Sequence, residues 1–445
     1  MEKLIFILDQ IRETFTKAPL LLTLFGTHIY FTIRLRGIQR KIPRGIRLSI
    51  GKDKDGRSAF STVATALAAT IGTGNIIGIS TAIAIGGPGA VFWCWLTGVL
   101  GIATCYAECY LSLKYRICIS DGEYIGGPMY VMEYRLKQKN VAILFSIAAI
   151  LVSFGMGCSV QARAISTAVT EQMAVPQELI GMILVCLTGM VILGGKHGIS
   201  RVCTLLVPFM SLCYMGGCLT LLWMNRAYLV ETLVWILSAA LGWKQAVGGV
   251  IGGIGMHVLY KSRMEGMQIG IVRGLFTNEA GLGSIPMAAA SSQVKNEEWQ
   301  ALISMTGPFW DTVVMCAVTG ITIVSSMVRS PELYMYYIEN GQSDKLCFLA
   351  FAQLPFAGKE ILSLSLVLFA FATILGWNYY GLCAVNYLGK GKRIYQVLYL
   401  LAGYFGCVMS LKMVWKLSDF FNVIMVIPNL LCLWILRKEI QTARF

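Results

Sequence analysis

The chain has 445 residues, of which 56% are hydrophobic and only 13% are charged, and its formal net charge is +14. Soluble globular proteins are about half apolar and about a quarter charged, so the composition excludes an ordinary soluble domain. No segment between the apolar runs is large enough to form a basic nucleic-acid-binding surface, and we assign the excess Lys and Arg to loops beside a membrane.

The apolar residues form continuous runs, which favour membrane-spanning helices over a β-barrel with its alternating strands. A helix needs about twenty apolar residues to cross a bilayer. Reading the runs against the polar breaks predicts about eleven spans, near residues 18–33, 59–86, 89–113, 140–170, 178–195, 202–225, 246–272, 301–326, 359–388, 394–412 and 418–436. We therefore expect an all-α integral membrane protein.

Lys and Arg are distributed unevenly between the predicted loops. With the N-terminus outside, the cytoplasmic segments carry 26 of them and the outside segments carry 10. Because positive residues accumulate in cytoplasmic loops, this predicts a multi-pass protein of the cell membrane with its N-terminus outside and its C-terminus in the cytoplasm. The loop 34–57 is the most basic cytoplasmic segment, and the outside loop 328–359 is a candidate extracellular cap.

Gly72, Thr73, Gly74 and Asn75 lie near the middle of the second predicted span. Each Gly costs a helix about 1 kcal/mol relative to Ala, and an Asn at this depth needs polar partners. An unwound helix here would present carbonyls to a cation and amides to an anion such as an amino-acid carboxylate. A helix-packing face with Gly74 and Gly78 four residues apart explains the same residues equally well.

The segment Gly270–Ala290 is a second interruption, with four Gly, one Pro, Arg273, Asn278 and Glu279 among apolar residues. Such a composition predicts a broken segment inside the bundle instead of a continuous lipid-facing helix. An ion pair between Arg273 and Glu279 is favoured here over a proton relay.

Thr373 and Trp377 are four residues apart and share one helical face in the segment Phe369–Gly381. A hydroxyl beside an aromatic ring suits a small amphiphilic ligand, although Trp and Tyr near span ends are commonly interface anchors. Other polar residues within spans should face the bundle interior; these are Glu108, Gln161, Arg163 and Asp311. They form no enzyme constellation, so we do not expect an enzyme.

Short motifs extend over nearly the whole chain in one order: Gly72–Asn75, Gly86–Trp93, Ala107–Glu108, Lys114–Arg116, Gly127–Tyr130, Arg273–Ser284, Ile374–Trp377, Tyr379–Gly381 and Ile427–Asn429. Together they resemble the alanine/glycine:cation symporters, a family of sodium-coupled amino-acid carriers. The resemblance implies a leucine-transporter-like fold, in which five helices are followed by an inverted repeat of five and the first and sixth core helices are broken.

The same resemblance implies three parts: an extra span and basic loop over 1–58, a transporter core over 59–436, and a cytoplasmic tail over 437–445. The core would hold repeats over roughly 59–225 and 246–412 and a further helix over 418–436. The implied function is symport of a small neutral amino acid, alanine or glycine, with sodium by alternating access. The expected partners are this substrate and the lipid bilayer, with no nucleic acid; the sequence does not indicate an oligomeric state.

Matching positions imply the site residues. Those expected to bind substrate are Thr73, Gly74, Asn75, Gln161, Phe276, Thr373 and Trp377. Those expected to bind sodium are the backbone carbonyls of Ala68, Ile71 and Phe369 together with the Thr373 hydroxyl.

The chain departs from the family at two positions near this expected site. Ala372 stands where the family usually has a hydroxyl residue, which removes one oxygen ligand from a hard cation. Arg163 stands where the family tends to have Asn, and its offset of two residues from Gln161 predicts that it points away from the Gln161 face. These departures leave an amino-acid-binding sensor, or an uncoupled or proton-coupled carrier, as the alternative function.

Overall fold

The computed structural model describes residues 19–51, 60–119, 123–242, 263–294, 296–389, 391–409 and 411–443. Parts of the predicted spans 18–33 and 246–272 and of the loop 34–57 lie outside these residues. Within them the chain is almost entirely helical, as its composition predicts, with one small hairpin in which β1 (Ile117–Cys118) pairs antiparallel with β2 (Tyr124–Ile125).

The helices of the first half are α2 (Pro19–Arg34), η1 (Ile38–Lys41), α3 (Ile42–Ile50), α4 (Phe60–Thr70), η2 (Thr73–Asn75), α5 (Ile77–Gly86), α6 (Gly89–Lys114), α7 (Pro128–Tyr130), η3 (Val131–Arg135), α8 (Lys139–Phe154), η4 (Gly155–Ser159), α9 (Val160–Gln172), α10 (Gln177–Leu193), α11 (Gly195–Met224), η5 (Arg226–Tyr228) and α12 (Leu229–Leu241). Those of the second half are α14 (Arg263–Asn278), α15 (Ile285–Ala290), α16 (Glu297–Ser304), α17 (Thr306–Pro308), η7 (Phe309–Cys316), α18 (Ala317–Arg329), α19 (Pro331–Glu339), η8 (Ser343–Lys345), α20 (Leu346–Phe351), α21 (Gly358–Leu388), α22 (Lys392–Val408), α23 (Leu411–Ile435) and η9 (Arg437–Glu439).

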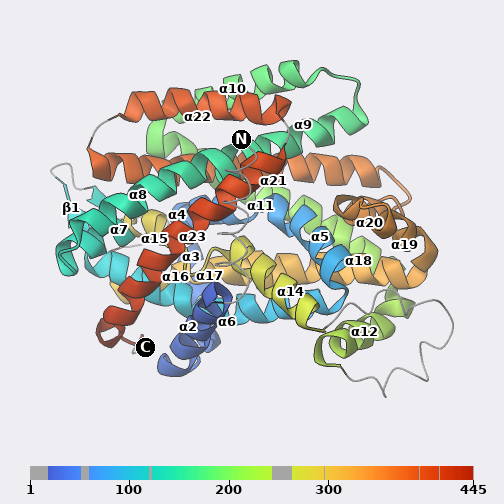
Figure 1. The fold of residues 1–445 in the computed structure, drawn as a ribbon, viewed down its shortest axis with the longest axis horizontal. Helices are drawn as coiled ribbons and strands as arrows, with labels where there is room; N and C mark the ends of the chain where they lie inside the picture. The colour runs from blue at the N-terminus through green and yellow to red at the C-terminus, as the bar shows by residue number, and fades with distance from the viewer. Residues whose placement is uncertain are drawn as a thin grey trace.

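Several helical segments are long and apolar enough to cross a membrane. Among the described residues five segments meet this condition, and α4 with η2 and α5 makes a sixth when the bent pair counts as one span. The long helices run in roughly the same direction across Figure 1, with α12, α19 and α20 at one end and β1 and α7 at the other. The predicted loop 328–359 contains α19, η8 and α20, so it is a folded helical element.

The second predicted span is broken where Gly72–Asn75 predicts it. α4 and the helical segment that begins at Thr73 meet at an angle of 59°. Gly72 has an extended backbone, and its amide donates a 2.9 Å hydrogen bond to the side chain of Asn75. The Asn75 side chain therefore supplies a partner that the interrupted helix does not.

The segment Gly270–Ala290 is also broken, between α14 and α15. The connection contains three residues with positive φ: Glu279, Gly281 and Gly283. Glu108 of α6 accepts hydrogen bonds of 3.2 Å from the amides of both glycines, and the Asn429 side chain of α23 donates to it at 2.9 Å. The buried Glu108 thus satisfies backbone groups that the break leaves without helical partners.

Helix α21 is continuous and passes very close to the first break. A Cβ added at Gly376 would lie 2.6 Å from the backbone nitrogen of Ala69, and one added at Gly72 would lie 2.5 Å from Oγ1 of Thr373. Because real Cβ atoms do not approach this closely, these two glycines are required for α4 and α21 to be in contact here.

Candidate transport site

One large cavity of about 800 Å³ extends from the two breaks toward the end of the molecule that carries α19 and α20. Its walls come from α4, η2, α5, α9, α14, α21 and η8. Six of the seven predicted substrate residues line it, namely Thr73, Gly74, Gln161, Phe276, Thr373 and Trp377. These six residues come from η2, α9, α14 and α21, so four segments that are far apart in the sequence meet at one cavity.

Asn75 is the seventh predicted substrate residue, and its side chain lies elsewhere. It is fully buried, and Nδ2 donates to the Asp311 carboxylate at 2.8 Å and to the Asp311 carbonyl at 3.1 Å. Its Oδ1 accepts from the Gly72 amide. Both ends of the amide are engaged within the protein, so in this conformation Asn75 can meet a ligand only through its backbone.

Gly74 and Gly78 do not form the helix-packing face that their spacing of four residues also allows. A Cβ at Gly78 would have no described atom within 4 Å, and one at Gly74 would make only ordinary contact with Thr277, at 3.5 Å. Both glycines instead line the cavity. Here the absence of side chains exposes backbone to the cavity.

Gln161 presents a polar side chain to the cavity from α9. Its Nε2 donates to the carbonyl of Met156 at 3.2 Å, and its buried Oε1 has no hydrogen-bond partner among the described residues. A buried acceptor without a partner is costly, and a ligand with N–H groups would satisfy it.

The predicted sodium ligands gather where α21 meets the break. The Thr373 hydroxyl is 3.0 Å from the carbonyl oxygen of Phe369 and 3.4 Å from that of Ile71. Ala68 lies about one turn earlier in α4, fully buried, and Ala372 beside Thr373 is fully buried too. Three oxygens of the predicted set are thus close together, and oxygen donors are what a hard cation prefers.

Two aromatic residues form apolar walls of the cavity. Trp377 is fully buried, and it packs so tightly on Gly157 that a Cβ there would lie 2.4 Å from Cβ of Trp377. Phe276 of α14 is half-buried and lines the same cavity. A ring fixed by close packing limits the size of a side chain that the cavity accepts.

Of two charged residues near the site, Arg163 does not line the cavity and Glu279 does. Arg163 points away from the cavity, as its offset from Gln161 predicts, and donates at 2.9 Å to the Gln177 side chain and to the carbonyl of Cys407. Glu279 lines the cavity, and no ion pair of Glu279, with Arg273 or any other residue, is found in the described part of the chain. The sequence shows that Glu279 is an acidic residue among apolar ones, but it does not show that the residue lines the cavity.

The mouth of the cavity is polar and is crossed by an ion pair. Lys345 of η8 lies 3.5 Å from Glu171 at the end of α9, and both residues line the cavity. The sequence does not reveal this contact, because it depends on how the loop 328–359 packs against the bundle.

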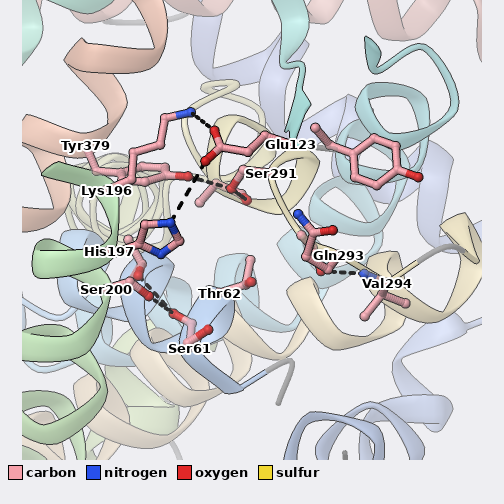
Figure 2. A pocket seen from close by; sticks show the side chains of 14 residues that line it. Ser61, Thr62, Glu123, Lys196, His197, Ser200, Ser291, Gln293, Val294 and Tyr379 are labelled. Carbon is pink, nitrogen blue, oxygen red and sulfur yellow. Dashed lines mark hydrogen bonds and ion pairs between the residues drawn. The ribbon is translucent and has the colours of Figure 1, made fainter. Parts of the chain in front are cut away.

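A second cavity of about 470 Å³ lies toward the hairpin end and shares no lining residue with the first. Figure 2 shows Glu123 facing Lys196 and His197, at 3.8 and 3.9 Å. In the same view the hydroxyls of Ser291 and Tyr379 are 2.5 Å apart. Polar contacts between the hairpin, α11, α21 and the end of α15 therefore surround this cavity.

The sequence is similar to known proteins over nearly its whole length. The sequence profile of the "Sodium:alanine symporter family" matches residues 1–444. The chain is 40% identical to an uncharacterized transporter of Haemophilus influenzae over 98% of its length and 94% of the relative's. It is 37% identical to the sodium/alanine symporter AgcS of Methanococcus maripaludis, over 94% of this chain and 91% of that protein.

A solved structure shares the fold at much lower sequence identity. It is a Na+-coupled sialic acid symporter in a substrate-bound outward-open state, with a TM-score of 0.56 and 11% identity over 94% of this chain and 97% of that one. At this identity the likeness concerns the arrangement of helices alone.

Proposed function

The chain belongs to the sodium:alanine symporter family, and from that premise we propose that it carries a small neutral amino acid, alanine or glycine, into the cell together with Na+ by alternating access. The single observation that carries this proposal is the oxygen cluster of Thr373, Phe369 and Ile71 at the wall of a cavity formed by two broken helices. Broken helices that meet at mid-membrane depth are how this kind of carrier binds ions and substrates.

Sodium would bind between α4 and α21. The Ile71 carbonyl directly follows the end of α4, and the Thr373 hydroxyl and Phe369 carbonyl belong to α21, so an ion bound to all three joins the first break to α21. The substrate carboxylate would meet the amides at the start of the next half-helix, at Thr73 and Gly74, which line the same cavity. Each ligand stabilises the same arrangement of the break, so each raises the affinity for the other.

The preference for a small side chain follows from the aromatic walls. Trp377 is held by its contact with Gly157 and cannot retreat without disturbing η4, while Phe276 lines the same cavity from α14. Close-packed walls accept a methyl group or a hydrogen more readily than a branched or charged side chain.

Alternating access would use the two cavities in turn. They share no lining residue, and the close contact of Gly376 with Ala69 lies between them. With the proposed orientation the larger cavity opens outward, beneath the α19–α20 cap, and the smaller one lies on the cytoplasmic side. The eleven spans and the inverted repeat belong to this proposal.

Uptake into proteoliposomes tests the proposal. An inward sodium gradient should drive accumulation of labelled alanine or glycine, and replacing sodium by potassium on both sides should abolish it. A folded protein that accumulates no neutral amino acid in sodium would contradict symport. Binding of an amino acid without net flux would favour the alternative, a sensor that keeps the fold; Ala372, which lacks the usual hydroxyl, is the observation behind that alternative.

A further inference from the structure

We propose that the carboxylate of Glu279 binds the ammonium group of the substrate and so makes the carrier select amino acids over monocarboxylates. The proposal rests on the function proposed above, because it assigns a role within the same cavity. Among the described residues of the cavity wall, Glu279 is the one fully buried acidic side chain that could meet the substrate's positive end.

The first argument is position. Glu279 lines the cavity together with Trp377 and Thr373, yet the residue as a whole is only 1% exposed. The other acidic residues on the cavity wall, Glu171, Glu265 and Asp344, are exposed. Among the charged residues described on this wall, Glu279 alone is fully buried, so it is the one in the region of low dielectric constant, where a charge acts most strongly.

The second argument is the backbone. Glu279 has a φ of +54°, in the left-handed region, where residues other than Gly, Asn and Asp are uncommon. Its neighbours hold it there: the Ala280 amide donates to Asn278 Oδ1 at 2.9 Å, and Glu108 accepts from the amides of Gly281 and Gly283. A conformation of this cost that its surroundings maintain is typical of a binding site.

The third argument is the partners of the carboxylate. Ser284 Oγ donates to Oε2 at 2.5 Å, and the Trp377 side chain is a second hydrogen-bond partner of the carboxylate; both partners are neutral, so they orient the group without compensating a negative charge. No ion pair of Glu279 is found among the residues that the structure describes. A buried carboxylate is expensive unless it is paired, so a cation that enters the cavity gains from meeting it.

An ammonium group fits this place better than a second metal ion. It has three N–H donors, and the cavity wall carries two acceptors for them: the Glu279 carboxylate and the Oε1 of Gln161, which has no hydrogen-bond partner among the described residues. A zwitterionic amino acid adds no net charge to the cavity, and its ammonium group would pair with the Glu279 carboxylate. A monocarboxylate would instead bring its negative charge toward Glu279 without an ammonium group to compensate it.

The test compares alanine with propionate, which has the same carboxylate and methyl group but no amine. Sodium-dependent binding of each is measured on purified wild type and on Glu279→Gln, which keeps an acceptor for Ser284 and removes the charge. Alanine affinity should fall at least about tenfold, as expected for loss of a charge-assisted hydrogen bond. Propionate affinity should stay the same or rise, since the repulsion disappears. Glu279→Asp, which keeps the charge, should retain the preference for alanine.

Control variants and sodium titrations separate the outcomes. Glu360→Gln removes an exposed acid from α21 outside the cavity and should leave both affinities unchanged. If alanine and propionate lose affinity by the same factor in Glu279→Gln, the role is structural and the proposal is overturned. It is equally overturned if sodium binding without substrate falls by the factor seen for alanine. Wild type that binds no amino acid in sodium refutes the proposed function itself, whereas wild-type binding with an unchanged preference in Glu279→Gln refutes only the role of Glu279.

Discussion

The amide of Asn75 donates a 2.8 Å hydrogen bond to the carboxylate of Asp311, which is 236 positions away in the chain. Asp311 lies in η7, a π-helical stretch, and its second carboxylate oxygen accepts from Thr312 at 2.6 Å. The other end of the Asn75 amide holds the amide of Gly72. One side chain thus links the first break to η7, a helical segment from the second half of the chain, and holds the Gly72 amide within the break.

Replacing Asn75 by Ala should therefore destabilise the fold. The change removes the Asn75 partner of Asp311 Oδ1 and of the Gly72 amide, at a cost of about 1–3 kcal/mol for each group. A thermal unfolding scan of the purified protein in detergent should show a clear decrease in midpoint, which Asn340→Ala in an exposed turn should not. An unchanged midpoint together with lost substrate binding would show instead that the Asn75 side chain is itself a substrate ligand.

Gly72→Ala should weaken sodium binding. The new Cβ would lie 2.5 Å from Oγ1 of Thr373, so α4 and α21 must move apart and the oxygens of Thr373 and Ile71 separate. We expect the half-saturating sodium concentration for uptake to rise by about tenfold or more, equivalent to at least about 1.4 kcal/mol. Gly216→Ala, a change in helix α11 with open space around the added carbon, is the matched control and should behave as wild type. Unaltered sodium dependence in Gly72→Ala would rule out a cation site at this contact.

Thr373→Val separates the hydroxyl from the shape of the side chain. Valine has nearly the same volume but no oxygen, so sodium loses a ligand while the packing against Gly72 is kept. Sodium affinity should fall, and alanine affinity measured in excess sodium should fall less. Thr373→Ser keeps the hydroxyl and should retain most of the sodium affinity. Equal losses in both variants would mean that the methyl group, not the oxygen, matters.

Both helix breaks were predictable from the sequence, because the residue types there conflict with a continuous helix. Gly, Thr and Asn accumulate at 72–75, and Gly and Pro at 270–290, and each segment is broken as expected. The direction of Arg163 was also predictable, since two residues on a helix place side chains on nearly opposite faces. The positions of the helix breaks and the direction of Arg163 therefore depend on residues close together in the sequence.

What could not be predicted depends on partners far away in the chain. The hydrogen bonds between the Asn75 side chain and Asp311 could not be read from the sequence. Arg273 and Glu279 both line the cavity, yet no ion pair between them is found among the described residues. The oxygen cluster around Thr373 followed from the family resemblance and not from spacing, because its members are some 300 residues apart.

The C-terminal tail gives a prediction for pH. Partial burial by itself raises the pKa of Glu439, but hydrogen bonds from Tyr115, Arg135 and Lys114 outweigh this and lower it from 4.5 to about 2. An acid whose pKa is lowered by folding stabilises the protein above its ordinary pKa, and this stabilisation is lost as the pH falls from 4.5 toward 2. The difference in unfolding midpoint between wild type and Glu439→Gln should therefore be constant from about pH 8 to about pH 5 and shrink below that. A difference that changes between about pH 6 and about pH 8 would point to another titrating group.

Ala372→Ser should strengthen sodium binding. The family usually has a hydroxyl at this position, and here the neighbouring Thr373 provides the only side-chain oxygen of the predicted cation set. A serine hydroxyl adds a ligand to an ion that favours six or more oxygens when they are available. The half-saturating sodium concentration for alanine uptake should then fall several-fold, with little change in maximal rate. Ala370→Ser places the same hydroxyl at another fully buried alanine of α21, two residues away and on a different face, and should not raise sodium affinity. If both serine variants act alike, or if Ala372→Ser leaves the sodium dependence unchanged, residue 372 does not face the ion and the missing hydroxyl does not limit coupling.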